Sequence, residues 1–118
     1  MAEGADSPDR NVRVACVQME PKVGAKDANV AASCRFIEAA AAEGAELIVL
    51  PELCNSGYVF ESLEEATALA EPLPGGPTCE AWAELAARLK LHIVAGINER
   101  DGDKLYNSAV VIGPEGYL

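Results

Sequence analysis

Positively charged residues are scarce in this sequence. The 9 Lys and Arg residues stand against 19 Asp and Glu residues, which gives a formal net charge of −10 at pH 7 and an isoelectric point near 4.4. Because no basic stripe is available to neutralise phosphate groups, this balance argues against nucleic-acid binding. It argues equally against binding to an anionic membrane surface.

Long apolar runs are also missing. No stretch of the chain approaches the ~20 apolar residues that are needed to cross a bilayer. The N-terminal segment MAEGADSPDRN has neither the basic region nor the apolar region of a secretory signal. We therefore predict a cytoplasmic protein with a flexible tail over residues 1–11 and one domain over residues 12–118.

The patterns that bind metals are absent as well. The chain has 4 cysteines and 1 histidine. No two cysteines form a CxxC pair, and His92 has no ligand partner in the sequence, so neither a zinc site nor a thioredoxin-like motif is expected. We predict no metal site, and we expect reduced thiols because the chain has no export signal.

Apolar strands and amphipathic helices alternate along the chain. Residues 12–18 are β-branched and almost continuously apolar, which is typical of a strand covered on both faces. Residues 47–50 form a second strand of this kind. Between them, Asp27 stands where a helix N-cap is expected and Gly44 where a helix ends. The apolar stripe of this helix consists of Val30, Cys34, Ile37 and Ala41. A strand, a helix and a strand in this order predict a βαβ unit with parallel strands.

The second half of the chain predicts two more helices and a hairpin. Ser62 and Glu65 have the spacing of a capping box, which opens a short helix. Pro77 suits the first turn of a longer helix. Residues 92–98 and 105–112 are predicted to form strands, and the Asp-Gly pair between them favours a β-hairpin. The fold class is therefore α/β, with two βαβ crossovers, one through each long helix, followed by the β-hairpin.

Glu52 is the most unusual residue for its position. It follows Pro51 at the carboxyl end of a predicted buried strand, and ligand sites of open α/β sheets lie outside the carboxyl ends of the strands. Partial desolvation there would raise the pKa of the carboxyl group and suit it to general acid–base catalysis. The alternative is a solvated loop glutamate or a helix cap. The remaining acidic residues are most simply solvated faces and caps.

Several segments together resemble the nitrilase superfamily of carbon–nitrogen hydrolases. The most specific is ELIVLPELCNSGY at residues 46–58, with the Leu-Pro-Glu motif around Glu52. Later segments agree in kind and order: LPGGP at 73–77, HIVAG at 92–96, LYNSAVVI at 105–112 and GPEG at 113–116. The resemblance covers nearly the whole chain, from about residue 11 to residue 118.

The resemblance implies a fold and a mechanism. Members of the superfamily are αββα sandwiches, so we expect this chain to form the first part of one, incomplete here. Members use a Glu–Lys–Cys triad without a metal or organic cofactor, and Glu52 matches the general base. The triad Lys and Cys follow segments like 113–116 in the family, so neither is expected in this chain. Tyr58 matches a position that often lies near the substrate pocket; its alternative role is to pack the loop.

The other candidate side chains carry weaker expectations. Cys54 stands two residues from Glu52. It could act as a nucleophile or pack as a thiol within the loop, and we favour the packed thiol. Cys16 and Cys34 are expected on core faces. Cys79 is expected near a helix start, where the pKa of a thiol can be lowered. Asn107 is expected to brace a loop by side-chain hydrogen bonds.

The leading hypothesis is the N-terminal part of a hydrolase that cleaves a non-peptide amide, N-carbamoyl or nitrile bond in a small molecule. Its expected partners are the remainder of the hydrolase polypeptide, which carries the Lys and Cys, and further copies of itself in a homo-oligomer. The alternative is a truncated, non-catalytic module that folds or acts only with a partner chain. A third hypothesis is a free-standing α/β domain with an unrelated carboxylate site.

Overall fold

The computed structural model describes residues 11–118, so most of the predicted N-terminal tail lies outside the described residues. The described part forms five strands and three helices: β1 (Val14–Cys16), α2 (Lys26–Ala42), β2 (Leu47–Val49), α3 (Leu63–Leu69), α4 (Pro77–Leu89), β3 (His92–Asp101), β4 (Lys104–Gly113) and β5 (Gly116–Tyr117). None of these helices is long and apolar enough to pass through a membrane.

The strands make one mixed sheet in the order β1-β2-β3-β4-β5. The two predicted crossovers are confirmed, since β1 pairs with β2 and β2 with β3 in parallel, with Ile48 opposite both Ala15 and Ile93. The predicted hairpin is also confirmed: β3 and β4 pair in antiparallel fashion up to Asp101 and Lys104. Gly102, with φ of +63°, is the first of the two loop residues.

Helix α2 begins and ends through its backbone rather than through a capping side chain. Its N-cap is Ala25, so the prediction of Asp27 as N-cap is wrong; Asp27 lies in the first turn, where a carboxylate still favours the helix dipole. At the other end Gly44 has φ of +90°, as predicted for a residue just past a helix. The amides of Gly44 and Ala45 donate to carbonyls of the last turn at 2.9 and 3.0 Å, which closes a Schellman motif.

The two later helices start as predicted. The Glu65 amide donates to Ser62 Oγ at 3.0 Å, while the Glu65 carboxylate accepts from the amide of Glu61 at 2.8 Å. In the usual capping box this carboxylate accepts from the amide of the N-cap residue itself, whereas here it accepts from the residue before the N-cap. Helix α4 has Pro77 at its first position.

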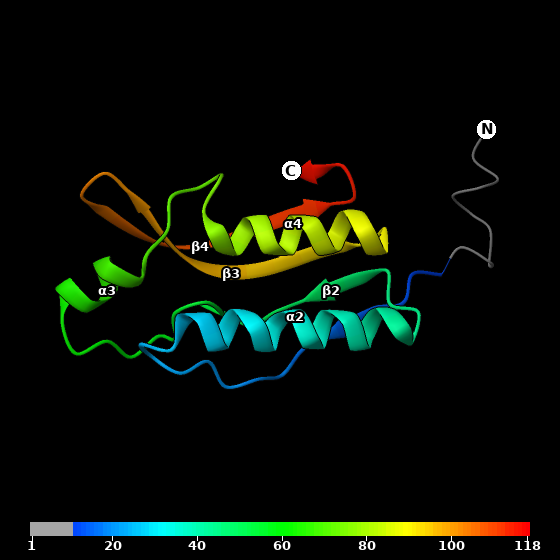
Figure 1. Cartoon of the computed structure of the whole chain (residues 1–118), viewed down its shortest axis with the longest axis horizontal. Coiled ribbons are helices and arrows are strands. Elements are labelled where there is room, and N and C mark those ends of the chain that lie inside the picture. The colour runs from blue at the N-terminus through cyan, green and yellow to red at the C-terminus, as the bar shows by residue number, and fades with distance from the viewer. Residues whose placement is uncertain (1–10) are drawn as a thin grey trace.

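Helices α2 and α4 lie side by side on one face of the sheet (Figure 1). Ile37 and Trp82 fill the space between helices and sheet, and the indole Nε1 of Trp82 donates to Ser33 Oγ at 2.9 Å. The buried face of α2 is formed by Asn29, Ser33 and Ile37, whereas Val30, Cys34 and Ala41 of the predicted stripe are only half-buried. Every second strand residue completes this core, among them Ile48, Ile93, Ala95, Ile97, Val110 and Ile112.

The opposite face of the sheet is uncovered among the described residues. Because side chains alternate along a strand, this face receives Val14, Cys16, Val94 and Val111. Val14 is 50% exposed and Val111 42% exposed, and the Cys16 thiol is exposed. The predictions of a first strand covered on both faces and of a buried Cys16 are therefore wrong for this part of the chain. One helix layer and one sheet layer are present.

Candidate active site

The chain does not leave the sheet when β2 ends. The Leu50 amide donates to the carbonyl of Val94 at 2.8 Å, the Gly96 amide to that of Pro51 at 3.2 Å, and the Cys54 amide to that of Gly96 at 3.0 Å. Residues 50–54 thus continue along β3 past the end of β2. Glu52 lies within this stretch, at the carboxyl edge of the parallel strands, which confirms its predicted place in the fold.

Gly96 permits this close approach. A Cβ at this position would lie 2.5 Å from Glu52 Cα and 2.7 Å from both the Leu53 nitrogen and the Pro51 oxygen. These are backbone atoms, which cannot rotate away as the end of a side chain can. A glycine inside a strand is therefore what allows the Glu52 segment to lie against β3.

Leu53, directly after Glu52, has an unusual backbone. Its φ is +44°, in the left-handed region that is uncommon for a residue with a branched side chain. The amides of Ser56 and Gly57 donate to the Leu53 carbonyl at 3.2 and 2.9 Å, so a tight turn holds this conformation. Such conformations persist where the surroundings fix them, and they cluster at active sites.

The Glu52 side chain meets Asn107 of β4. The Asn107 amide nitrogen Nδ2 donates to Glu52 Oε2 at 2.6 Å. Glu52 is exposed, so the expected desolvation of its carboxylate is not provided by the described residues. Both side chains line a cavity of about 340 Å³ on the uncovered sheet face, together with Leu50, Val94, Ala95, Gly96, Ser108 and Ala109.

The loop after Glu52 is anchored by a buried asparagine. Asn55 is fully buried; its Oδ1 accepts from the amide of Asn98 at 3.1 Å, and its carbonyl accepts from Nδ2 of Asn29 at 3.0 Å. Its own Nδ2 donates to Oε2 of Glu71 at 3.2 Å. The loop is thereby tied to β3, to α2 and to the connector before α4.

Glu71 is a buried charge, contrary to the expectation that the remaining acidic residues are solvated. It is 2% exposed and accepts from the Thr78 amide at 2.8 Å and from the Thr78 hydroxyl. Lys26 Nζ lies 3.4 Å from Glu71 Oε2. A buried carboxylate is tolerated when it is paired and hydrogen-bonded, and Glu71 is both.

The buried cysteines are poorly suited to act as nucleophiles. Burial raises the pKa of the Cys54 thiol to about 12 and that of the Cys79 thiol to about 11, the latter with help from the negative charge of Glu71. Both thiols are therefore protonated near neutral pH, and the thiolate is the reactive form. The packed-thiol interpretation of Cys54 is supported, with its sulfur 3.8 Å from Met19 Sδ. The expectation of a lowered pKa for Cys79 is wrong, because burial raises the pKa by more than the nearby helix N-terminus could lower it.

Tyr58 is not brought to Glu52 by this part of the chain. Its side chain is 54% exposed and is not among the residues that line the cavity beside Glu52. Within residues 11–118, no three His, Cys, Asp or Glu side chains are grouped in a way that could hold a metal ion.

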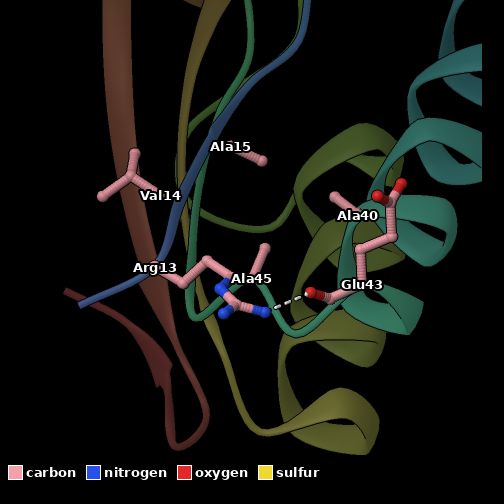
Figure 2. A pocket seen from close by; sticks show the side chains of 6 residues that line it. All are labelled: Arg13, Val14, Ala15, Ala40, Glu43 and Ala45. Atoms are coloured by element: carbon pink, nitrogen blue, oxygen red, sulfur yellow. Dashed lines mark hydrogen bonds between the residues drawn. The ribbon is translucent and has the colours of Figure 1, made fainter. Parts of the chain in front are cut away.

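A second cavity, of about 380 Å³, lies away from Glu52 at the C-terminal end of α2 (Figure 2). The Nη1 atom of Arg13 donates to the Glu43 carbonyl at 2.9 Å, and the Arg13 amide donates to Glu46 Oε2 at 3.0 Å. A cation at a helix C-terminus stabilises the helix dipole. The other residues that line this cavity are Val14, Ala15, Ala40 and Ala45. None of its lining side chains is a nucleophile, so we assign the cavity a structural role.

The roles of Gly96, Asn55 and Glu71 were not predicted from the sequence. The role of Gly96 was predictable, since an isolated glycine inside an apolar strand suggests a close backbone approach. The roles of Asn55 and Glu71 were not predictable, because their hydrogen-bond partners lie on distant segments of the chain. Asn107 was expected to brace a loop, and the residue that it braces is the candidate base.

The chain matches known proteins along almost its entire described length. The family model for carbon–nitrogen hydrolases matches residues 13–118. A nitrilase of Pyrococcus abyssi is 45% identical over 107 residues, which cover 91% of this chain and 41% of that protein. The omega-amidase NIT2 of Homo sapiens is 37% identical over 107 residues, covering 90% and 37%. The solved structure of Saccharomyces cerevisiae Nit3, a member of branch 10 of the nitrilase superfamily, superposes with a TM-score of 0.78 at 30% identity, covering 91% of this chain and 41% of that chain.

The matched part of the chain contains the whole candidate site. The matched residues include Glu52, Asn107 and every described helix and strand. The chain spans about two fifths of the length of these relatives. By its sequence and by its fold, the chain belongs to the carbon–nitrogen hydrolases of the nitrilase superfamily.

Proposed function

We propose that this chain supplies Glu52 as the general base of a Glu–Lys–Cys hydrolase that cleaves non-peptide carbon–nitrogen bonds in small molecules. The observation that carries the proposal is the placement of the Glu52 carboxylate at the carboxyl edge of the parallel strands, beside a cavity of about 340 Å³ and 2.6 Å from Asn107 Nδ2. Family membership supports the reaction class.

The proposed reaction proceeds through a covalent intermediate. Glu52 accepts the proton of a cysteine thiol, and the thiolate attacks the carbon of the substrate amide or nitrile. Ammonia or an amine leaves, and Glu52 then activates the water that hydrolyses the acyl-enzyme. A lysine stabilises the oxyanion. The raised pKa of Cys54 and of Cys79 argues against these two thiols as the nucleophile. The family resemblance instead puts the nucleophile after segments like 113–116.

The substrate class is also a proposal. Omega-amidases are among the relatives, and we propose an amide or N-carbamoyl substrate ahead of a nitrile. Tyr58, exposed here, is proposed to line the substrate pocket once the rest of the hydrolase is in place. Self-association and a cytoplasmic location stay predictions. This chain alone is predicted to be inactive, because it carries one triad member.

The test is Glu52→Gln in the complete hydrolase, formed by this chain and the polypeptide with the Lys and Cys. General-base catalysis contributes about 10²- to 10⁴-fold to rate, so kcat on a small amide should fall by at least this factor. Glu115→Gln, at an exposed turn, is the control and should keep wild-type activity.

Two results would count against the proposal. Retention of wild-type kcat in Glu52→Gln would remove Glu52 as the base. A complete wild-type protein inactive on amides, N-carbamoyl compounds and nitriles would favour the alternative of a non-catalytic module.

A further inference from the structure

We infer that Asn107 is a positioning residue that orients the Glu52 carboxylate for proton transfer; this inference rests on the proposed role of Glu52. The contact is direct, with Nδ2 of Asn107 and Oε2 of Glu52 separated by 2.6 Å. An ionised carboxylate only accepts hydrogen bonds, and the amide nitrogen of asparagine only donates, so the pair is chemically matched.

The donor stands on a rigid element and the carboxylate on a loop. Asn107 lies in the middle of β4, opposite Asn98 in the β3–β4 ladder. Glu52 lies in a turn, beside a leucine whose backbone is left-handed. Because the strand is the stiffer partner, the hydrogen bond fixes the side chain of the loop residue rather than the reverse.

The hydrogen bond also gives the two oxygens of the Glu52 carboxylate different roles. Oε2 is occupied by the Asn107 amide, which leaves Oε1 to receive the proton of the nucleophile.

The test compares Asn107→Ala and Asn107→Asp in the complete hydrolase, with the pH dependence of kcat/KM as the readout. Removing the donor takes away a hydrogen bond that favours the charged form of the carboxylate, so the acidic limb of the profile should move to higher pH. The value of kcat/KM at its optimum should fall by about tenfold to a hundredfold. Asn107→Asp keeps the shape but places a second carboxylate against the first, so its acidic limb should move further than that of Asn107→Ala.

Asn98→Ala is the matched structural control. Asn98 faces Asn107 across the ladder, but its Nδ2 donates to the Ala66 carbonyl at 3.0 Å instead of to Glu52. This variant should lower thermal stability and leave the acidic limb in place.

Two outcomes would overturn the inference, and they are distinguishable. If both Asn107 variants leave the acidic limb unmoved while Glu52→Gln abolishes turnover, Asn107 has no positioning role, whatever the loss in rate. If Glu52→Gln itself remains active, the proposed function fails and this inference fails with it.

Discussion

At Gly96 the missing side chain lets residues 51–53 lie directly against β3. The hypothetical Cβ would stand 2.5 Å from Glu52 Cα, closer than real Cβ contacts allow. The position of the candidate base is therefore set by two neighbours: Gly96 beneath its backbone and Asn107 beside its carboxylate. Both residues therefore decide where the carboxylate lies.

Gly96→Ala should therefore displace Glu52 and weaken the fold. We expect the free energy of unfolding to fall by about 1–3 kcal/mol, as for other overpacked sites, because the Glu52 segment must move. A displacement of about 1 Å can cost ~10²-fold in rate, so kcat should fall as well. Chemical denaturation and steady-state kinetics would measure the two effects.

Gly113→Ala is the control for that substitution. A Cβ at Gly113 would meet the far end of the His92 ring at 3.0 Å, and a side chain can adjust more easily than backbone atoms. Its cost should be smaller than that of Gly96→Ala. Equal stability and activity of the wild type and Gly96→Ala would contradict the close-approach argument.

Between elements, the buried carboxylate of Glu71 joins four parts of the chain. It contacts Lys26 at the start of α2, Asn55 in the loop after Glu52, and Thr78 in the first turn of α4, while its own backbone lies in the connector before α4. The Glu71 amide donates to the Asn98 carbonyl of β3 at 2.9 Å. The loop that carries the candidate base is therefore held by an ion-pair network and not by apolar packing alone.

Glu71→Ala should be strongly destabilising. It would leave the partly buried ammonium of Lys26 without its partner and remove the acceptor of two Thr78 donors and the Asn55 amide. Breaking a buried pair in this way costs about 3–5 kcal/mol, which urea denaturation would detect.

Glu38→Ala provides the matched comparison. Glu38 pairs with Arg88 across α2 and α4 at 2.5 Å, but both side chains are about half exposed, at 50% and 54%. Exposed pairs contribute about 0–1 kcal/mol, so this variant should be nearly neutral. Similar losses of stability in Glu38→Ala and Glu71→Ala would contradict the network described above.

The elements themselves were predictable because their signals are local. The apolar strands, the Ser62 cap, Pro77 and the Asp-Gly turn act within a few residues, and each predicted an element that the structure contains. The contacts of the site were not predictable in this way. Glu52 and Asn107 are 55 residues apart, and Asn55 and Asn98 are 43 apart, so only the sheet pairing brings them together. Burial of Asn29 and Ser33 in α2 likewise depends on partners elsewhere in the chain.

At the scale of the whole molecule, the decisive feature of residues 11–118 is a sheet with α2 and α4 on one face (Figure 1). Among these residues the second face is uncovered and exposes apolar side chains such as Val14 and Val111. The cavity with Glu52 and Asn107 opens on that second face. In an αββα sandwich a second sheet packs there. We therefore propose that the lysine and cysteine of the triad lie across the open face from Glu52, in polypeptide beyond the two fifths of its relatives' length that this chain spans.

A crystal structure of the complete hydrolase would test the proposed role of Glu52 most directly. We predict a cysteine thiol and a lysine ammonium over the cavity, each within about 4 Å of the Glu52 carboxylate or bridged to it by one water. We also expect the hydrogen bond between Asn107 and Glu52 to be retained. A nucleophilic cysteine on another face of the fold, out of reach of Glu52 even through a water, would contradict the proposal that Glu52 is the general base.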